Sequence, residues 1–369
     1  MTQALSPEEI FKVTREKYRK AINESSPIFA LYEITKACDR PCKYPMIDCK
    51  YCGLTNQSTE EELGTQEVYR LINNIAQSGT RSLSFVGGEP TTRTDLIDIV
   101  SHASGRMEIS VITNGLAIDS KYAYKLRQAR TSWVKIYIDS PDAELHDSLR
   151  GEGTHHQALQ ALENCKDEGI ATSIINTVTP QNMDHLREML RLSLEKKSLL
   201  EITEVLPSHD GKGSELILSK EQRKEVQMYL LEARKLFGRD RIRFAEYYMI
   251  GEDKEGMAVW ADPAAGGFNV GYGWGIYGYG IKPNGKVVPD PLITIELGNL
   301  MEQRLTDIWA NAVVVKNLRH RGRLKGKCGR CEYRFICGGH RGRVYVLTGD
   351  LMEEDPACWY EPSPESVID

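Results

Sequence analysis

The chain has 369 residues, of which 41% are hydrophobic and 27% charged, with a formal net charge of −5. This length predicts one large domain and a smaller one, and the charge excludes a strongly basic nucleic-acid-binding protein. No run approaches the roughly 20 apolar residues that a bilayer span requires, and no apolar segment near Met1 predicts a signal peptide. We therefore expect a cytoplasmic protein without nucleic-acid or membrane partners.

Short apolar runs alternate with amphipathic helical stretches from residue 28 to residue 205. The predicted strands are residues 28–34, 82–86, 109–113, 134–139, 172–178 and 200–206. The predicted helices between them are residues 65–77, 95–104, 120–128, 156–167 and 183–196. This alternation predicts an α/β fold with parallel strands, in which six strand–helix units form an incomplete barrel. Chemistry is then expected at the carboxyl ends of the strands.

The remaining segments define the predicted domain organisation. An N-terminal helix is expected within residues 1–27, and the barrel covers residues 28–237 and ends with a helix that Ser219 caps. Residues 238–265 connect it to a second domain, residues 266–360, which contains a hairpin with its turn at Pro283-Asn284-Gly285. The polar residues 361–369 are a tail.

Eight of the nine cysteines fall into two groups. Four lie between residues 38 and 52, and four lie between residues 328 and 358: Cys38, Cys42, Cys49, Cys52, Cys328, Cys331, Cys337 and Cys358. In a chain without a secretion signal, such groups indicate metal ligands rather than disulfides. Iron–sulfur clusters and zinc both use thiolates at these spacings. Cys165 stands alone, at helical spacing from apolar residues, and is interpreted as a buried packing residue.

Ordered motifs follow the predicted strands. Ile34-Thr35 precedes Cys38, Cys49-Lys50-Tyr51-Cys52 comes next, Gly87-Gly88-Glu89-Pro90 follows the second strand, and Thr113-Asn114-Gly115 follows the third. Together they resemble the radical S-adenosylmethionine (radical SAM) superfamily, and residues 137–151 resemble members with a C-terminal SPASM domain. The resemblance implies a partial (β/α)6 TIM-like barrel of the radical SAM type, followed by a small SPASM-like iron–sulfur domain.

The resemblance also implies the cofactors and the reaction. Three thiolates bind a [4Fe–4S] cluster, and S-adenosylmethionine chelates its open iron. Reductive cleavage of S-adenosylmethionine gives a 5′-deoxyadenosyl radical, which abstracts hydrogen from a substrate C–H bond. An electron donor of the flavodoxin or ferredoxin type is expected as a partner.

The first cysteine group departs from the family spacing Cys-x3-Cys-x2-Cys, because Pro45 stands where the third cysteine is expected. An insertion in the loop resolves this, with Cys38, Cys49 and Cys52 as ligands, since loops tolerate insertions. The alternative uses Cys42 in place of Cys38 or Cys49. If Cys42 is not a ligand, it is a structural thiol or a catalytic thiol that donates hydrogen.

Other candidate site residues follow from the resemblance. Gly87, Gly88, Glu89 and Pro90 are expected at the amino group of S-adenosylmethionine, with Glu89 shaping the turn. Arg150 matches an arginine that binds the cofactor carboxylate in related enzymes, a bidentate role that suits a guanidinium. Its alternative role is a surface ion pair.

Other positions allow more than one interpretation. Asn114 either contacts the cofactor or adopts a left-handed turn. Tyr137 stands where members often carry a serine that touches the cofactor, and Ser140 lies nearby. On the sixth predicted strand, Glu201 and Glu204 either point into the barrel, where they could act on a polar substrate, or lie exposed at a helix edge.

The C-terminal cysteines match all four ligands of the outer auxiliary cluster of SPASM domains. Cysteines for a second, inner cluster are expected where this chain has Asp290 and Arg341. The chain is therefore predicted to hold one auxiliary [4Fe–4S] cluster, with zinc at the same site as the alternative.

Three functions are considered. The first is dehydrogenation or epimerisation of a small polar metabolite, such as a carbohydrate, because only about 30 residues precede the first strand and no leader-binding module is expected there. The second is a peptide- or protein-modifying maturase. The third is a non-catalytic iron–sulfur or zinc scaffold. Epimerisation needs a thiol hydrogen donor, for which Cys42 and Cys165 remain, whereas dehydrogenation needs an electron acceptor such as an auxiliary cluster.

Overall fold

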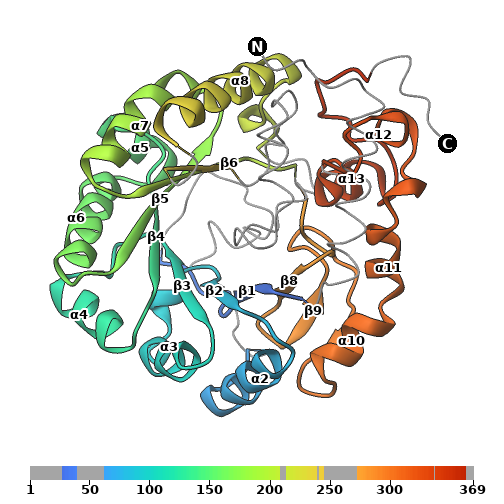
Figure 1. The fold of residues 1–369 in the computed structure, drawn as a ribbon. Helices are drawn as coiled ribbons and strands as arrows, with labels where there is room; N and C mark the ends of the chain where they lie inside the picture. The colour runs from blue at the N-terminus through green and yellow to red at the C-terminus, as the bar shows by residue number, and fades with distance from the viewer. Residues whose placement is uncertain are drawn as a thin grey trace.

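The computed structural model describes residues 27–39, 62–207, 213–238, 241–244, 272–335 and 337–362. Ten strands form one sheet in the order β10-β9-β8-β1-β2-β3-β4-β5-β6-β7. The sheet curves into an open barrel, and α2 to α8 cover its outer side (Figure 1). Within these residues, no helix is long and apolar enough to cross a membrane.

The predicted α/β fold with a partial barrel is confirmed. The six predicted strands correspond to β1 to β6, which lie side by side and parallel in the sheet. They are β1 Phe29–Glu33, β2 Ser82–Val86, β3 Glu108–Thr113, β4 Trp133–Tyr137, β5 Ala171–Val178 and β6 Leu199–Glu204. The structure adds a further parallel strand, β7 Ile242–Phe244, inside the segment predicted to be a connection. The predicted N-terminal helix lies outside the described residues.

The helices of the barrel also follow the prediction. They are α2 Thr65–Gln77, α3 Leu96–Ser104, α4 Ser120–Gln128, α6 Thr154–Asp167, α7 Leu186–Glu195 and α8 Lys220–Phe237. Ser219 caps α8 by accepting a hydrogen bond from the backbone of Gln222, as expected. One further helix, α5 Ala143–Arg150, was not predicted from the sequence; its eight residues include three charged ones in the first and last turns.

The C-terminal segment continues the barrel sheet. β8 Gly278–Ile281 pairs in parallel with β1, and β9 Lys286–Val288 and β10 Gly298–Asn299 follow antiparallel. The predicted hairpin turn is confirmed, with Gly285 at a φ of 83°. The helices after it are α10 Leu305–Asn311, α11 Val313–Arg319, α12 Gly326–Arg330 and α13 Arg341–Thr348.

The two faces of the barrel strands differ. On the outer face, alternate residues such as Tyr32, Phe85 and Ile136 are fully buried against the helices and belong to one hydrophobic core. Cys165 on α6 is part of this core with no exposed surface, so its interpretation as a packing residue is confirmed. The inner face carries polar side chains such as Ser110, Lys135 and Glu201 together with apolar ones such as Ile112 and Ile175. The alternation of side chains along each strand decides which residues can reach a ligand inside the barrel.

Candidate cofactor and cluster sites

The turn after β2 packs directly on the segment that leads to Cys38. The backbone N–H of Gly88 donates to the carbonyl of Thr35 (2.8 Å), and that of Glu89 donates to the carbonyl of Ala37 (2.7 Å). A Cβ on Gly88 would lie 2.2 Å from the Ala37 oxygen. Because Gly88 has no side chain, the two backbone segments can approach each other closely. The hydrogen bonds between them hold the segment that leads to Cys38.

The other ligands predicted for this cluster, Cys42, Cys49 and Cys52, lie outside the described residues. Cys38 itself is partly buried, with its thiol not in a disulfide. The choice of three ligands among the four cysteines therefore stays a prediction.

Glu89 joins the ends of β2 and β3. Its carboxylate accepts hydrogen bonds from the backbone and hydroxyl of Thr91, the hydroxyl of Thr113 and the backbone N–H of Asn114. Glu89 is 2% exposed, and burial raises its pKa, while these donors oppose the rise. Pro90 follows at the first position of a 3-10 turn, Pro90–Thr92. Glu89 shapes the turn, as the sequence predicts.

Asn114 holds a turn rather than adopting a left-handed conformation itself. Its side-chain oxygen accepts from the N–H of Leu116 (2.9 Å), and its Nδ2 donates to Asp39 (2.9 Å). The residue with positive φ is the next one, Gly115, at 83°. Asn114 thereby connects the end of β3 to the residue after Cys38.

Arg150, at the end of α5, is buried at the carboxyl end of β4. Its Nε donates to the carboxylate of Asp139, its Nη2 donates to Thr177 (3.2 Å), and its guanidinium lies 4.3 Å from the centre of the Tyr137 ring. Arg150 is 7% exposed, so the alternative of a surface ion pair does not describe it. The tyrosine that replaces the family's serine therefore contacts the arginine that is expected to bind the cofactor carboxylate.

Ser140 is fully buried and directly follows Asp139, the partner of this arginine. Its hydroxyl shares a hydrogen bond with Nδ1 of His185 (3.0 Å) and accepts one from the backbone N–H of Asp142 (3.0 Å). Nearby, Nδ1 of His146 accepts from the N–H of Asp139 (3.1 Å), and burial lowers the pKa of His146 to about 4. His155 is buried against the His146 ring.

Glu201 and Glu204 point to opposite faces of β6. Glu201 lies on the inner face, where Nζ of Lys135 is 2.8 Å from its carboxylate and Ser173 donates to it (2.8 Å). On the same face of the sheet, the hydroxyls of Ser84 and Ser110 share a hydrogen bond of 2.6 Å. The inner face of the barrel therefore offers both charge and hydrogen-bonding groups to a ligand.

Glu204 lies on the helix side and is 3% exposed. Nε of Arg223 on α8 donates to it (2.8 Å), and Nη1 of Arg343 on α13 forms a second ion pair with it. Arg343 also donates to Asp355 with two nitrogens, at 3.1 and 2.8 Å. Glu204 is thus paired with two arginines that link the barrel to the C-terminal segment, and it does not face the inside of the barrel.

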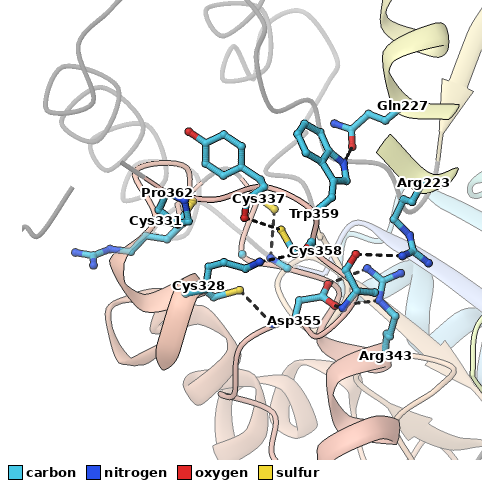
Figure 2. Close-up of a pocket in the computed structure, with 16 residues that line it drawn as sticks. Arg223, Gln227, Cys328, Cys331, Cys337, Arg343, Asp355, Cys358, Trp359 and Pro362 are labelled. Carbon is cyan, nitrogen blue, oxygen red and sulfur yellow. Dashed lines mark hydrogen bonds and ion pairs between the residues drawn. The ribbon is translucent and has the colours of Figure 1, made fainter. Parts of the chain in front are cut away.

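The four C-terminal cysteines line a single pocket (Figure 2). Backbone N–H groups point at the sulfurs: Cys328 Sγ accepts from Asp355 (3.4 Å) and Cys337 Sγ accepts from Gly339 (3.4 Å). Other lining residues include Trp359, whose Nε1 donates to Gln227 on α8 (2.9 Å), as well as Lys327, Tyr360 and Pro362.

This pocket fits a cluster that carries positive metal ions. Burial raises the pKa values of Cys331, Cys337 and Cys358, and the neighbouring thiols add to the effect. These three thiols therefore do not ionise readily by themselves, whereas coordination to iron deprotonates a thiol. Backbone N–H donors aimed at sulfur are also what a thiolate-bound iron–sulfur cluster uses.

Sequence reasoning missed several polar residues of these sites. Asp139 accepts from the N–H of Thr177 (2.8 Å) besides pairing with Arg150, and Asn182 bridges the carbonyls of Asp139 and Thr177 (2.8 and 2.9 Å). Near the cysteines, Arg343 and Asp355 were also missed. Two sequence features could have indicated them: an aspartate at the end of a buried strand, and arginines between the clustered cysteines.

Comparison with known proteins identifies the class. Residues 32–193 match the model of the Radical SAM superfamily, and residues 274–332 match SPASM, an iron–sulfur cluster-binding domain. The chain is a radical SAM enzyme with a SPASM domain. Its cofactors are therefore a [4Fe–4S] cluster with S-adenosylmethionine and the auxiliary iron–sulfur cluster of the SPASM domain.

Individual relatives resemble most of the chain. An AdoMet-dependent heme synthase of Oleidesulfovibrio alaskensis is 29% identical, over 95% of this chain and 92% of its own length. A PqqA peptide cyclase of Bradyrhizobium diazoefficiens is 26% identical, over 93% of this chain and 88% of its own. The crystal structure of Streptococcus suis SuiB bound to S-adenosylmethionine has a TM-score of 0.72 at 16% identity, over 95% of this chain and 82% of that one. The last similarity supports the fold.

Proposed function

We propose that the chain is an oxidoreductase that removes hydrogen from a small polar molecule, with a carboxylate-bearing tetrapyrrole as the first substrate class to test. The observation that carries the proposal is the polar inner face of the barrel, where Lys135, Glu201 and Ser173 form one bonded group. A half-buried cation and neighbouring hydroxyls suit carboxylates. The similarity to a heme synthase over nearly the whole chain supports the tetrapyrrole class.

The residues at the strand ends are assigned to the cofactor. S-adenosylmethionine, when bound, supplies the radical that takes the substrate hydrogen. We assign Cys38, Cys49 and Cys52 to the cluster that cleaves it, and residues 87–90 to its amino group. Arg150 is assigned to its carboxylate, and Asn114 and Ser140 to its neighbourhood. In this arrangement Asp139 orients Arg150 by holding its Nε.

The fate of the substrate electron distinguishes dehydrogenation from epimerisation. Cys165 is fully buried on the helix side of the sheet, and burial raises its pKa to about 12. It therefore does not reach a substrate inside the barrel, which leaves Cys42 as the candidate thiol. The four-cysteine pocket provides a site for the acceptor of a second electron. These two observations favour dehydrogenation, with a flavodoxin or ferredoxin as the external donor.

The iron content of the protein tests whether both clusters are present. Anaerobically reconstituted protein is expected to hold about eight irons per chain, as two [4Fe–4S] clusters. Replacing Cys328 and Cys331 with Ala is expected to reduce this to about four. Zinc at the C-terminal cysteines of the unaltered protein would contradict the assignment.

Turnover assays test the proposed reaction and its substrate class. With dithionite and S-adenosylmethionine, the reconstituted protein is expected to release 5′-deoxyadenosine, and carboxylated porphyrins are expected to raise the rate and yield an oxidised product. Lys135→Met is expected to raise KM for such a substrate about tenfold, while the yield of 5′-deoxyadenosine without substrate stays unchanged. A scaffold without catalytic function would release no 5′-deoxyadenosine.

Peptide modification is the second candidate, and the similarity to a PqqA peptide cyclase favours it. The same assay separates the two. If peptide substrates accelerate 5′-deoxyadenosine release and porphyrins do not, the small-molecule proposal is wrong.

A further inference from the structure

Arg341 is a buried arginine behind the four-cysteine pocket, at the start of α13. It is 3% exposed, and its Nη1 donates to the carbonyls of Leu351 (3.0 Å) and Glu353 (2.6 Å). Its Nη2 donates to the sulfur of Cys328 (3.6 Å). Within the described parts of the chain, its Nε is buried without a hydrogen-bond partner. The guanidinium is therefore held by carbonyls on one side and faces a predicted cluster ligand on the other.

The charge of Arg341 lowers the pKa values of Asp355 and Asp350, so both carboxylates lie near it. Glu204 and Asp355, two of the buried carboxylates in this region, form their ion pairs with Arg223 and Arg343 instead. In the portion of the chain that the structure describes, no carboxylate lies within ion-pair distance of Arg341. An unpaired buried charge is costly, by several kcal/mol in typical proteins. A thiolate at Cys328, within a negatively charged cluster, would supply a counter-charge in direct hydrogen-bond contact with the guanidinium.

The backbone beside the pocket is shaped around this guanidinium. Gly339 has a φ of +69°, and a Cβ there would lie 2.2 Å from Nη2 of Arg341. The N–H of the same glycine donates to Cys337 Sγ. One residue therefore leaves space for the arginine and also binds a cluster sulfur, which ties the position of Arg341 to that of the cysteine pocket.

We propose that Arg341 is the counter-cation of the auxiliary cluster and raises its reduction potential. The proposal rests on the proposed function, in that Cys328, Cys331, Cys337 and Cys358 hold an iron–sulfur cluster. Reduction adds one electron to the cluster and makes or breaks no bond. A fixed positive charge next to a ligand sulfur, screened little in a buried site, stabilises the reduced form more than the oxidised one.

The test isolates the auxiliary cluster in the full-length chain. Cys38, Cys42, Cys49 and Cys52 are replaced with Ala, so that iron binds at the C-terminal site alone, and the reduced fraction is followed by electron paramagnetic resonance in an anaerobic redox titration. In this background, Arg341→Gln is expected to lower the ratio of reduced to oxidised cluster about tenfold at a fixed potential, which is about 59 mV for one electron. Arg341→Lys retains the charge, so its ratio of reduced to oxidised cluster is expected to stay close to that of the parent.

Arg330→Gln is the matched control, because Arg330 lies between Cys328 and Cys331 in sequence but is exposed. It is expected to change the ratio less than twofold, since solvent screens its charge. An unchanged ratio in Arg341→Gln, or an equal change in Arg330→Gln, overturns the proposal. Loss of iron in Arg341→Gln alone supports it, whereas loss of iron in both Arg341 variants shows that charge is not the cause and overturns it. If the parent binds no iron, the cluster assignment itself has failed.

Discussion

Two regions of the molecule each bury a carboxylate beside a predicted cluster ligand, but they neutralise it differently. Glu89, at the end of β2, accepts hydrogen bonds from hydroxyls and backbone N–H groups, and burial raises its pKa. Burial also acts to raise the pKa of Asp355, near the C-terminal cysteines, but Arg343 lowers it below its ordinary value. The barrel turn thus relies on neutral dipoles, whereas the cysteine pocket relies on fixed charges.

The difference follows from what each region must hold. The turn at Glu89 fixes backbone segments, and backbone N–H groups bond well to a single carboxylate. The pocket at Asp355 joins separate elements, β6, α8 and α13, through side chains. Arginine can reach across such distances and bond to two carboxylates at once, as Arg343 does with Glu204 and Asp355.

The largest expected effect breaks the charged region. Arg343→Gln leaves Asp355 buried without its main partner and removes one of the two partners of Glu204. Breaking a buried pair by removing one partner costs about 3–5 kcal/mol. We expect the free energy of unfolding to fall by this amount in anaerobic denaturant titrations, with loss of iron from the C-terminal site.

Arg330→Gln again serves as the control, and surface substitutions of this kind are expected within about 0.5 kcal/mol of the parent. A loss below about 1 kcal/mol in Arg343→Gln would show that the charge network does not stabilise the pocket, and the contrast with Glu89 would disappear.

A pH titration sharpens the comparison on the barrel side, where His146 is kept neutral as an acceptor for the N–H of Asp139. Its folded pKa of about 4 lies below the ordinary 6.5, so the unfolded chain binds the proton first as the pH falls. Stability is complete above pH 6.5 and is lost toward pH 4, by about 3 kcal/mol at about 1.4 kcal/mol per pKa unit. The measurement is the free energy of unfolding between pH 7 and pH 4.

His146→Asn keeps a side-chain acceptor but cannot titrate. We therefore expect its free energy of unfolding to change less with pH between pH 7 and pH 4 than that of the parent. The exposed neighbour His156 provides the matched variant, His156→Asn, which is expected to leave the pH dependence unchanged. Equal slopes in the parent and in His146→Asn would show that other groups cause the acid sensitivity.

Much of this architecture could be predicted because it follows periodic patterns. The strands alternate apolar residues toward the helices, and α2 carries Val68, Leu71, Ile72 and Ile75 on one buried face. The hairpin at Gly285 follows from a residue pair with a known backbone preference. Such signals are local, so each can be interpreted without knowing the rest of the fold.

The sites were less predictable because their partners are distant in sequence. Glu204 and Arg343 are 139 residues apart, and no local pattern shows that they meet. The face on which Glu204 lies depends on strand register, which a shift of one residue reverses. Likewise, the space beside Gly88 is filled by the backbone of Ala37, a contact between distant residues that the local Gly-Gly motif does not show.

The smallest expected effect tests the barrel turn itself. In Gly88→Ala, the new Cβ meets the carbonyl of Ala37 at 2.2 Å, and backbone must move because no flexible side chain is involved. Overpacking of this kind costs about 1–3 kcal/mol. Gly105→Ala is the matched control, since no atom lies within 4 Å of its Cβ and its φ is −76°, so we expect a change of less than about 1 kcal/mol there. If both variants unfold at the same denaturant concentration as the parent, the backbone of the turn moves enough to accommodate the added methyl group. The position of Cys38 then depends on residues other than the two glycines.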